Sequence, residues 1–488
     1  MNYISIEFFF FVMLSLLIYY IIPIKNRWII LLVFSFSFYL SFDKIYILFL
    51  LTTILTTFFC GVLLEKSKHK KLVLILCIVI NAFIWFLTKN YNWYALTFNR
   101  LLNVLNIDLF SMPVINNIIV PIGISYFVLQ SIGYLIDVYH GYKAEHNVFK
   151  YSLFLTWFPA IVQGPISRYE QLSKQLFNNK KFDYDNFSHN MLLIIFGVIK
   201  KMVIADNIAV IVNYCYQNVD SLEGFILYLG AIAYSIQLYM DFAGCVDICR
   251  GVSGLFRIKL IQNFKSPYFS KSIKEFWSRW HISLSTWLKD YIYIPLGGNR
   301  KGKYRKYLNI LIVFIVSGIW HGAGICFIIW GLLHALFQII GDITLSMRIS
   351  LKKVLHITDN YSSNIYSTII TFNLVTFAWI FFRAPSLEIA LLYFKNMFEL
   401  TNLYILFDGS LFSYGLNQNT LLIVLLNILL VFYVDYKHYR NTFGMRNNIQ
   451  SLHILLRWSI YFLLIYDILL FGAYGVGISS TAFLYGGF

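Results

Sequence analysis

The sequence predicts an all-α, polytopic membrane protein, and its composition and the length of its apolar runs are the reasons. Of its 488 residues, 59% are hydrophobic, 19% are aromatic and only 13% are charged, which is unusual for a soluble domain. The apolar runs are long and apolar on every side, unlike the alternating strands of a membrane barrel. We expect a single integral membrane domain over residues 1–488, with about 11–13 spans plus re-entrant and interfacial helices.

Short polar or basic breaks separate these runs. The first run has no basic region before it and no small-residue cleavage site after it, so we expect it to remain as a span. Several runs hold only about 12 to 15 residues, a length typical of tilted or re-entrant segments around a cavity, and this indicates a funnel or tunnel. The expected spans are residues 3–22, 28–40, 45–64, 72–87, 118–138, 149–161, 190–212, 225–241, 308–320, 322–340, 365–382, 421–434 and 454–471.

The net charge of +16 is concentrated in short loops between the spans. Such loops are expected to be cytoplasmic, which places both termini outside the cell and favours a bacterial inner (cytoplasmic) membrane. The excess charge suits anionic lipid of the bilayer, with an anionic soluble substrate as the alternative. No continuous basic stripe indicates nucleic acid. The basic loops are Lys66 with Lys68, Lys70 and Lys71, Lys200 with Lys201, and residues 250–274, 289–306, 348–353 and 437–446.

The six cysteines mostly lie inside apolar runs, so no disulfide framework is expected. Cys245 and Cys249 would share a helical face, but no second Cys/His pair with zinc-like spacing lies nearby, so we expect core residues and no metal site. Residues 90–117, which are polar and include Pro113, are expected to form a folded extracytoplasmic loop.

Asp241 and Asp247 open the region in which chemistry is expected, residues 241–334. Both stand at or just beyond the end of an apolar span, where a carboxylate is costly unless it is paired or hydrated. Each suits a helix cap, and the alternative is that they shape a polar vestibule.

The block KEFWSRWHISLSTWLKDYIYIPLGGNRKGKYRKY, residues 274–307, is rich in the aromatic residues of membrane interfaces and ends in a basic loop. It is expected to lie at the cytoplasmic interface and to line an entrance. Its basic residues suit phosphate groups, although each one alone is better explained as an orientation signal. They are Arg279, Lys289, Arg300, Lys301, Lys303, Arg305 and Lys306.

His321 lies between two apolar runs, with Trp320 before it and Gly322 and Gly324 after it. Ionisable residues at membrane depth usually face an interior path, and small neighbours allow a substrate to approach. Histidine suits a general base that takes a hydroxyl proton during acyl transfer, and an interhelical hydrogen bond is the alternative. On a continuous helix His334 would point well away from His321, so we expect it to be structural.

The order DFAGCVDICRG, EFWSRWHISLSTWLKDYIYIPLGGNR, SGIWHGAG and WGLLHAL closely resembles the membrane-bound O-acyltransferase (MBOAT) family. The resemblance is to its bacterial branch, which includes the membrane subunits of alginate and peptidoglycan O-acetyltransferases and the D-alanyl transfer protein of teichoic acid synthesis. GPISRYEQL, residues 164–172, and the terminal AFLYGGF also resemble this branch. The motif core covers residues 164–340.

The resemblance implies a core in which a cytoplasmic and an extracytoplasmic funnel meet in a tunnel at a catalytic histidine, which maps onto His321. The second family histidine maps onto His281. It also implies acetyl-CoA as the acyl donor, with no permanently bound cofactor, and a polysaccharide acceptor served by an extracytoplasmic SGNH-type acetyltransferase or a small membrane partner. The candidates for the tunnel or donor site are Trp320, Gly322, Trp280, Arg279, Arg168, Asp241 and Arg300, with Pro165 beside Arg168.

Cys245, Cys249 and Arg250 depart from the usual residues of the branch, which leaves the identity of the acyl donor open. One alternative is therefore D-alanyl transfer to teichoic acid from a carrier protein. The other is a transporter of polysaccharide or lipid precursors, which predicts paired discontinuous helices in two related halves. No such internal symmetry is seen in the sequence.

Overall fold

The computed structural model describes residues 1–107, 110–116, 118–178, 180–356, 361–399, 403–440, 449 and 451–474, and this part of the chain is helical with no β-strand. The terminal AFLYGGF lies outside the described residues. The first helices are α1 (Ile6–Ile21), α2 (Arg27–Leu40), α3 (Tyr46–Lys66), α4 (Lys70–Lys89), α5 (Tyr91–Val104), α6 (Ile124–Tyr139), α7 (Val148–Thr156), α8 (Tyr169–Leu176), α9 (Tyr184–Val198) and α10 (Asp206–Gln217). They are followed by α11 (Phe225–Leu255), α12 (Ile273–Arg279), α13 (Ile282–Leu288), α14 (Lys303–His321), α15 (Ile325–Ile343), α16 (Leu345–Val354), α17 (Tyr361–Arg383), α18 (Leu387–Met397), α19 (Gln418–Tyr439) and α21 (Ile454–Phe471).

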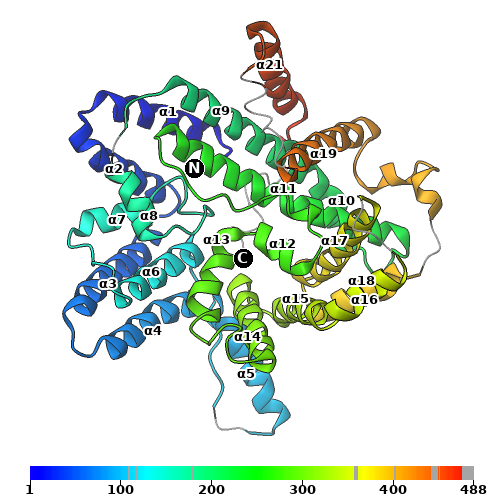
Figure 1. The fold of residues 1–488 in the computed structure, drawn as a ribbon, viewed down its shortest axis with the longest axis horizontal. Helices are drawn as coiled ribbons and strands as arrows, with labels where there is room; N and C mark the ends of the chain where they lie inside the picture. Colours follow the sequence, from blue (N-terminus) through cyan, green and yellow to red (C-terminus); the bar gives the residue numbers. More distant parts are fainter. Residues whose placement is uncertain are drawn as a thin grey trace.

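Figure 1 shows α1 to α4 and α6 to α8 on one side of the molecule, α15 to α19 on the other, and α11, α12 and α13 between them, with α5 below α14 at the bottom of the view. Among the described helices, seven are long and apolar enough to cross a membrane: α3, α4, α11, α15, α17, α19 and α21. Each of the thirteen expected spans contains at least part of a helix. The predicted helical membrane fold is therefore confirmed.

Two of the expected spans are only partly helical. The run at 118–138 becomes helical only at Ile124, and in the run at 149–161 α7 ends at Thr156. Residues 157–164 then form buried turns. Non-helical backbone at this depth is tolerated because protein surrounds it, which is the re-entrant arrangement that the short run predicts.

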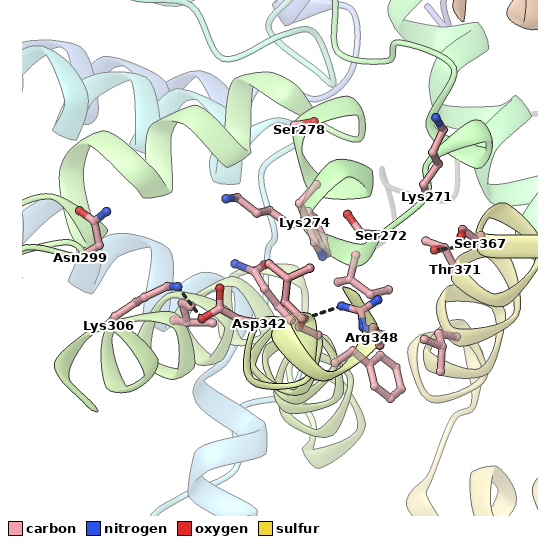
Figure 2. A pocket seen from close by; sticks show the side chains of 18 of the residues that line it. Lys271, Ser272, Lys274, Ser278, Asn299, Lys306, Asp342, Arg348, Ser367 and Thr371 are labelled. Atoms are coloured by element: carbon pink, nitrogen blue, oxygen red, sulfur yellow. Dashed lines mark hydrogen bonds and ion pairs between the residues drawn. The ribbon is translucent and has the colours of Figure 1, made fainter. Parts of the chain in front are cut away.

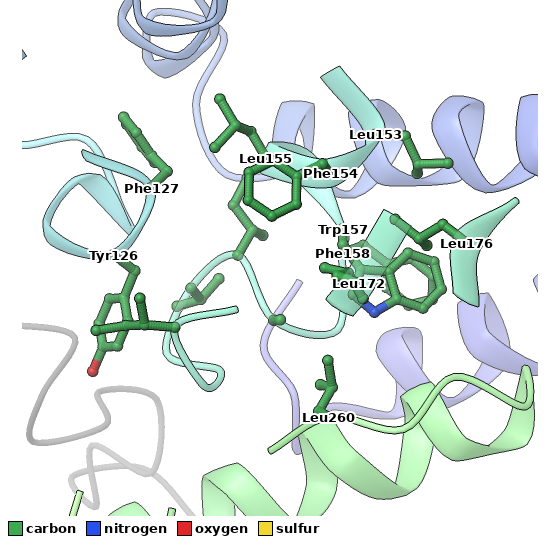
Figure 3. Close-up of a cluster of buried hydrophobic side chains, with 14 of the residues drawn as sticks. Tyr126, Phe127, Leu153, Phe154, Leu155, Trp157, Phe158, Leu172, Leu176 and Leu260 are labelled. Atoms are coloured by element: carbon green, nitrogen blue, oxygen red, sulfur yellow. The ribbon is translucent and has the colours of Figure 1, made fainter. Parts of the chain in front are cut away.

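A large aromatic cluster encloses these turns (Figure 3). Tyr126 and Phe127 of α6 lie on one side of it and Trp157 and Phe158 on the other, with Leu260 below. The Trp157 indole N–H donates to Ser253 Oγ in α11 at 2.8 Å, so the turn is joined to the central helix by a hydrogen bond as well as by packing. The half of the molecule built from α1 to α8 is thus attached to α11.

The segment that carries Lys200 and Lys201 is not a loop, which corrects the prediction made from their charge. A π-helix, Ile199–Ala205, joins α9 to α10 without a break, and Lys201 is only 2% exposed. Its ammonium pairs with Asp206 at 2.8 Å and with Asp241 at 2.5 Å. Lysine at this depth is stabilised by these two carboxylates instead of by water.

Asp241 and Asp247 cap no helix, because α11 continues fourteen residues past Asp241 to Leu255. Asp241 pairs with Lys201, and Asp247 pairs with Lys200 at 2.7 Å and Arg250 at 3.0 Å. The predicted end of the span at residue 241 is therefore wrong. Ion pairs between the π-helix and α11 let charged residues occupy the interior of the helix packing.

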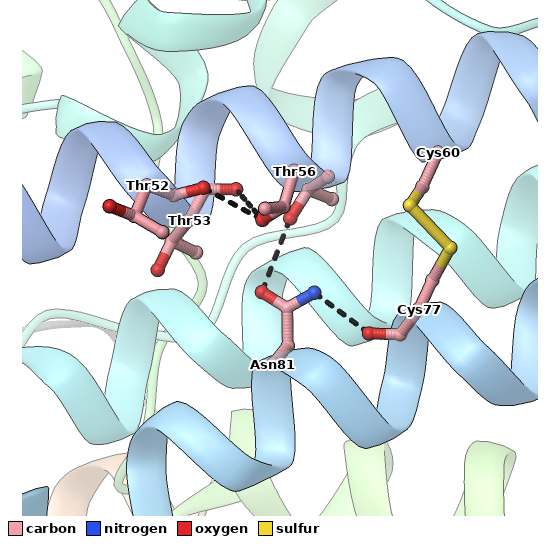
Figure 4. Close-up of a disulfide and its surroundings, with 7 residues drawn as sticks. Thr52, Thr53, Thr56, Cys60, Cys77 and Asn81 are labelled. Atoms are coloured by element: carbon pink, nitrogen blue, oxygen red, sulfur yellow. Dashed lines mark hydrogen bonds between the residues drawn. A yellow bond between two sulfur atoms is a disulfide. The ribbon is translucent and has the colours of Figure 1, made fainter.

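A disulfide joins Cys60 of α3 to Cys77 of α4, with a Cα–Cα distance of 6.3 Å (Figure 4). One bridge is thus present although no disulfide framework was predicted. The two cysteines are almost equally far from the turn at 67–69, so an antiparallel hairpin places them at the same depth. The folded loop predicted at 90–117 contains α5, and Asn117 lies outside the described residues.

Candidate active site

The hairpin of α14 and α15 places His321 in the interior. α14 ends at His321, and Gly322 and Gly324 make the turn into α15. The two helices pack backbone to backbone: a Cβ on Gly318 would lie 2.4 Å from the Phe327 carbonyl oxygen, and one on Gly331 would lie 2.3 Å from that of Phe314. Glycine at these positions allows the close approach, and it leaves His321 only 3% exposed.

His281 lies beside His321, forty residues away in sequence, and the ring centroids are 6.5 Å apart. His281 is completely buried, and its backbone is left-handed, with φ 43° and ψ 53°, just before α13. For a residue other than glycine this conformation costs on the order of 1–3 kcal/mol and persists only where the surroundings hold it. Asn263 does so, because its backbone carbonyl accepts from Ile282 N–H and its side-chain oxygen accepts from Ser283 N–H, both at 3.0 Å.

Aromatic rings surround the two histidines. Trp320, Trp330 and Phe382 lie 4.8, 5.0 and 5.3 Å from the His321 ring, and Phe242 lies 4.8 Å from the His281 ring. This shell buries both imidazoles and restricts their rotamers. The pair is therefore dry and preorganised, as proton transfer at a defined atom requires.

A cavity of about 2060 Å³ opens beside α14, larger than the usual ligand pocket of about 300–1,000 Å³. It lies among α12, α13, α14, the end of α15, α16 and α17, at the end of α14 and α15 that carries the basic loops. In Figure 2, Lys271 and Lys274 lie on the α12 side, and Lys306, Asp342 and Arg348 lie opposite them. Its described basic lining residues are Lys271, Lys274, Lys289, Arg300, Lys306, Arg348, Lys352 and Lys353.

The cavity is strongly electropositive, because Asp342 is the one carboxylate among its described lining residues. Asp342 is paired with Lys306 at 2.7 Å. Lysine and arginine clustered around a space of this size suit a ligand that carries several phosphate groups. The aromatic Trp277 and Phe314 also line the cavity, and their ring centroids lie 5.1 and 6.1 Å from that of His334, which makes that part apolar.

The cavity also reaches Ser317, which lies one helical turn before His321 on α14. A turn of helix rises about 5.4 Å, and residues four apart share a face. Neither His281 nor His321 lines the cavity, and Ser317 is the lining residue of α14 that lies nearest to His321 in sequence. The arrangement suits a reagent whose charged part stays at the basic mouth while its reactive group enters the dry interior.

A family model for MBOAT, the membrane-bound O-acyltransferase family, matches residues 34–379. The chain belongs to this family. It is thus a multi-pass membrane protein and an O-acyltransferase, and the predicted motif core at 164–340 lies within the matched region. The family assignment excludes the transporter considered above as the main function.

Curated relatives have two kinds of acyl chemistry in their names. The chain is 34% identical to a probable alginate O-acetylase of Pseudomonas syringae pv. tomato over 397 residues, 80% of this chain and 74% of that protein. It is 33% identical to a peptidoglycan O-acetyltransferase of Helicobacter pylori over 396 residues, covering 74% of this chain and 72% of the relative. It is 30% identical to a teichoic acid D-alanyltransferase of Bacillus subtilis over 281 residues, 55% of this chain and 69% of that one.

The other candidate residues of this MBOAT protein are dispersed. Arg300 lines the cavity, whereas Arg279 pairs with Glu275 at 3.0 Å and lies over the Tyr439 ring. Arg168 pairs with Asp290 at 3.0 Å and lies over the Tyr291 ring, away from the cavity lining.

Four further candidates are buried where helices pack against one another. Trp320 packs against His321, and its indole N–H donates to the Ser125 carbonyl oxygen at 3.3 Å. Gly322 begins the turn after His321, and its missing side chain leaves room for the Phe327 ring. Trp280 is buried between Phe276 and Trp379 in the hydrophobic core, and Asp241 belongs to the Lys201 ion pairs.

His334 is closer to the site than its place in the sequence suggests. α14 and α15 are separate antiparallel helices, so the angle expected from one continuous helix does not apply. Trp330 separates the two rings, 5.0 Å from His321 and 5.2 Å from His334. His334 Nδ1 accepts from the Trp277 indole N–H at 3.3 Å, which ties the cavity wall to α15.

Sequence reasoning missed Lys89, the last residue of α4. Its ammonium donates to Ser125 Oγ at 3.1 Å and to the backbone carbonyls of Trp320 at 3.2 Å and His321 at 3.4 Å. These carbonyls belong to the last turn of α14, where helix geometry leaves acceptors without intrahelical donors. The one signal in the sequence is a lysine at the end of a strongly apolar span.

Proposed function

We propose that this chain takes an acetyl group from cytoplasmic acetyl-CoA and moves it across the membrane toward hydroxyl groups of a cell-wall or secreted polysaccharide. The observation that carries the proposal is the electropositive cavity that reaches Ser317, one turn from His321. The phosphates of coenzyme A bind at the basic mouth, and the thioester reaches the interior. The proposal includes an inner (cytoplasmic) membrane location with both termini outside, which follows from the basic loops.

His321 acts as the general base in this reaction. It removes the proton of the acceptor hydroxyl as the oxygen attacks the thioester carbonyl, and it returns the proton to the leaving thiolate. A thioester is already activated, so alignment and proton handling account for most of the catalysis. His281, 6.5 Å from His321 between ring centroids, positions the acceptor or the donor.

The acceptor side of the proposal rests on the names of the relatives, alginate O-acetylase and peptidoglycan O-acetyltransferase. A polysaccharide outside the membrane cannot enter a site enclosed by helices, so a second protein carries the acetyl group onward. We assign this role to an extracytoplasmic SGNH-type acetyltransferase or a small membrane partner.

D-alanyl transfer to teichoic acid is the second candidate, and the Bacillus subtilis relative favours it. A carrier protein would bring the D-alanyl thioester on a phosphopantetheine arm, which has one phosphate where coenzyme A has several. The eight basic residues that line the cavity suit the more highly charged donor. We therefore place acetyl-CoA first.

Replacing His321 by Ala or Gln tests the proposal. Proteoliposomes are supplied with radiolabelled acetyl-CoA, and a parallel set receives a D-alanyl carrier. We expect the wild type to transfer or hydrolyse acetyl groups and both variants to lose at least about 99% of this activity, since general base catalysis contributes about 10²–10⁴-fold. The Gln variant fills the site, so it separates lost chemistry from lost folding.

His140→Ala is the control, because His140, the residue directly after α6, is exposed. It should retain wild-type activity. Full acetyl transfer by a stably folded His321→Gln protein would refute the role of His321. Turnover of the D-alanyl carrier alone would replace acetyl-CoA with the second candidate.

A further inference from the structure

Ser317 is a buried hydroxyl that the helix does not use. It is 1% exposed, and its Oγ has no hydrogen-bond partner within the described part of the chain. Serine and threonine in helices usually donate to the carbonyl one turn earlier, as Ser235 and Thr88 do in this protein at 3.1 and 3.0 Å. A buried hydroxyl without a partner destabilises the fold, so it needs an explanation.

The position of Ser317 on α14 supplies an explanation for this unpaired hydroxyl. Ile310, Val313, Phe314 and Ser317 line the cavity at helical spacing and form one stripe on α14. Ser317 is the polar member of this stripe and lies nearest to His321. A ligand that enters along the stripe passes apolar side chains first and meets the hydroxyl one turn before the imidazole.

We infer that the Ser317 hydroxyl donates a hydrogen bond to the carbonyl oxygen of the donor thioester and holds the oxyanion that forms there. The inference rests on the proposed function. The acceptor oxygen bonds to the carbonyl carbon while His321 takes its proton, and the π electrons move to the carbonyl oxygen beside Ser317. The tetrahedral species then collapses, the C–S bond breaks, and the thiolate leaves with the proton from His321.

Ser317 acts here as a hydrogen-bond donor and not as a nucleophile. A nucleophilic serine needs a base within hydrogen-bond distance of its Oγ, and no described group occupies that position. An oxyanion donor, in contrast, stays unsatisfied until the substrate arrives. The unpaired state of Oγ therefore fits the second role.

The experiment compares the full-length wild type with Ser317→Ala and Ser317→Thr in proteoliposomes. We measure the release of coenzyme A thiol from acetyl-CoA at several donor concentrations. Ser317→Ala should lower kcat about 10- to 100-fold with KM for acetyl-CoA changed less than about threefold, because the hydrogen bond strengthens only in the transition state. Ser317→Thr keeps a hydroxyl and should recover most of the activity.

Ser131→Ala is the matched control. Ser131 in α6 is likewise a fully buried helical serine, but it does not line the cavity. Its removal should leave kcat and KM unchanged. If the Ser317 hydroxyl had only a structural role, Ser317→Ala and Ser131→Ala would show the same kcat and KM.

Several results would overturn the inference. Wild-type kcat in Ser317→Ala, or a raised KM with unchanged kcat, would remove the transition-state role. Acetylated Ser317 in rapidly quenched wild-type protein, detected by mass spectrometry, would make it a nucleophile. If the wild type uses the D-alanyl carrier and not acetyl-CoA, the proposed donor is wrong, and the same variants test the role of Ser317 with that carrier. If the wild type turns over neither donor, both the proposed function and the role of Ser317 are overturned.

Discussion

Lys89 shows how one side chain controls the geometry around His321. Its ammonium contacts the carbonyls of Trp320 and His321 and lies 5.8 Å from the Trp320 ring centroid. A cation at the C-terminal end of a helix is stabilised by the helix dipole and by hydrogen bonds to the last carbonyls. Lys89 thus joins α4 to the end of α14 and fixes where His321 stands.

We predict that Lys89→Met lowers acyl transfer about tenfold, equivalent to ~1.4 kcal/mol of transition-state stabilisation. The methionine keeps the length of the side chain but removes the charge and its donors. Lys89→Arg keeps both and should retain more activity. The check is to measure the initial rate of acyl transfer and the thermal unfolding midpoint of the wild type and both variants. Equal rates for the three proteins would show that Lys89 does not position His321.

Among the elements, α11 and the π-helix before α10 depend on one another. Lys201 neutralises Asp206 and Asp241 together, and all three side chains are at most 10% exposed. The extra residue of a π-turn widens the helix and turns Lys201 toward α11. Both predictions that failed in this region, a cytoplasmic loop at Lys201 and a helix end at Asp241, failed because each charge was considered without its partner.

We predict that Lys201→Met is more damaging than Asp241→Asn. Removing one partner of a buried ion pair costs about 3–5 kcal/mol, and Lys201→Met leaves two carboxylates without a cation. Asp241→Asn leaves the pair between Lys201 and Asp206 intact. Unfolding of the two variants in the same detergent, followed by intrinsic fluorescence, checks the order; Asp241→Asn as the less stable variant would contradict it.

At the scale of the whole molecule, the electropositive cavity is assembled from helices that are distant in sequence. Lys274 comes from α12, Lys306 from α14 and Arg348 from α16. The packing of α12 to α17 explains why these charges face one space. In the proposed orientation, the positive-inside pattern would place them on the cytoplasmic side. In the proposed function, the same charges would both orient the protein in the membrane and bind the donor.

We predict that replacing Lys271, Lys274 and Arg348 together by Gln raises KM for acetyl-CoA by at least tenfold with little change in kcat. The reason is that these residues attract the phosphates and do not touch the thioester. Added salt should raise the wild-type KM more than that of the variant, because it screens the cavity charges. Replacing Lys66, Lys68 and Lys70 by Gln removes as much charge outside the cavity and should leave KM unchanged.

The sequence by itself determined the helical membrane class, the approximate positions of the spans and the family. Hydropathy is a local property, since each span must satisfy its own backbone in lipid, and motifs around His281 and His321 are short and contiguous. It also identified Arg300 in the block that lines the cavity.

Only the tertiary structure decided which of these residues meet. The 6.5 Å approach of His281 to His321, the ion pairs of Lys201, the Lys89 contacts with α14 and the Cys60–Cys77 bridge all join separate helices. The same holds for the cavity at Ser317, which needs α12 to α17 in place. Such contacts depend on helix packing, and no single segment of the sequence contains the two surfaces that must fit together.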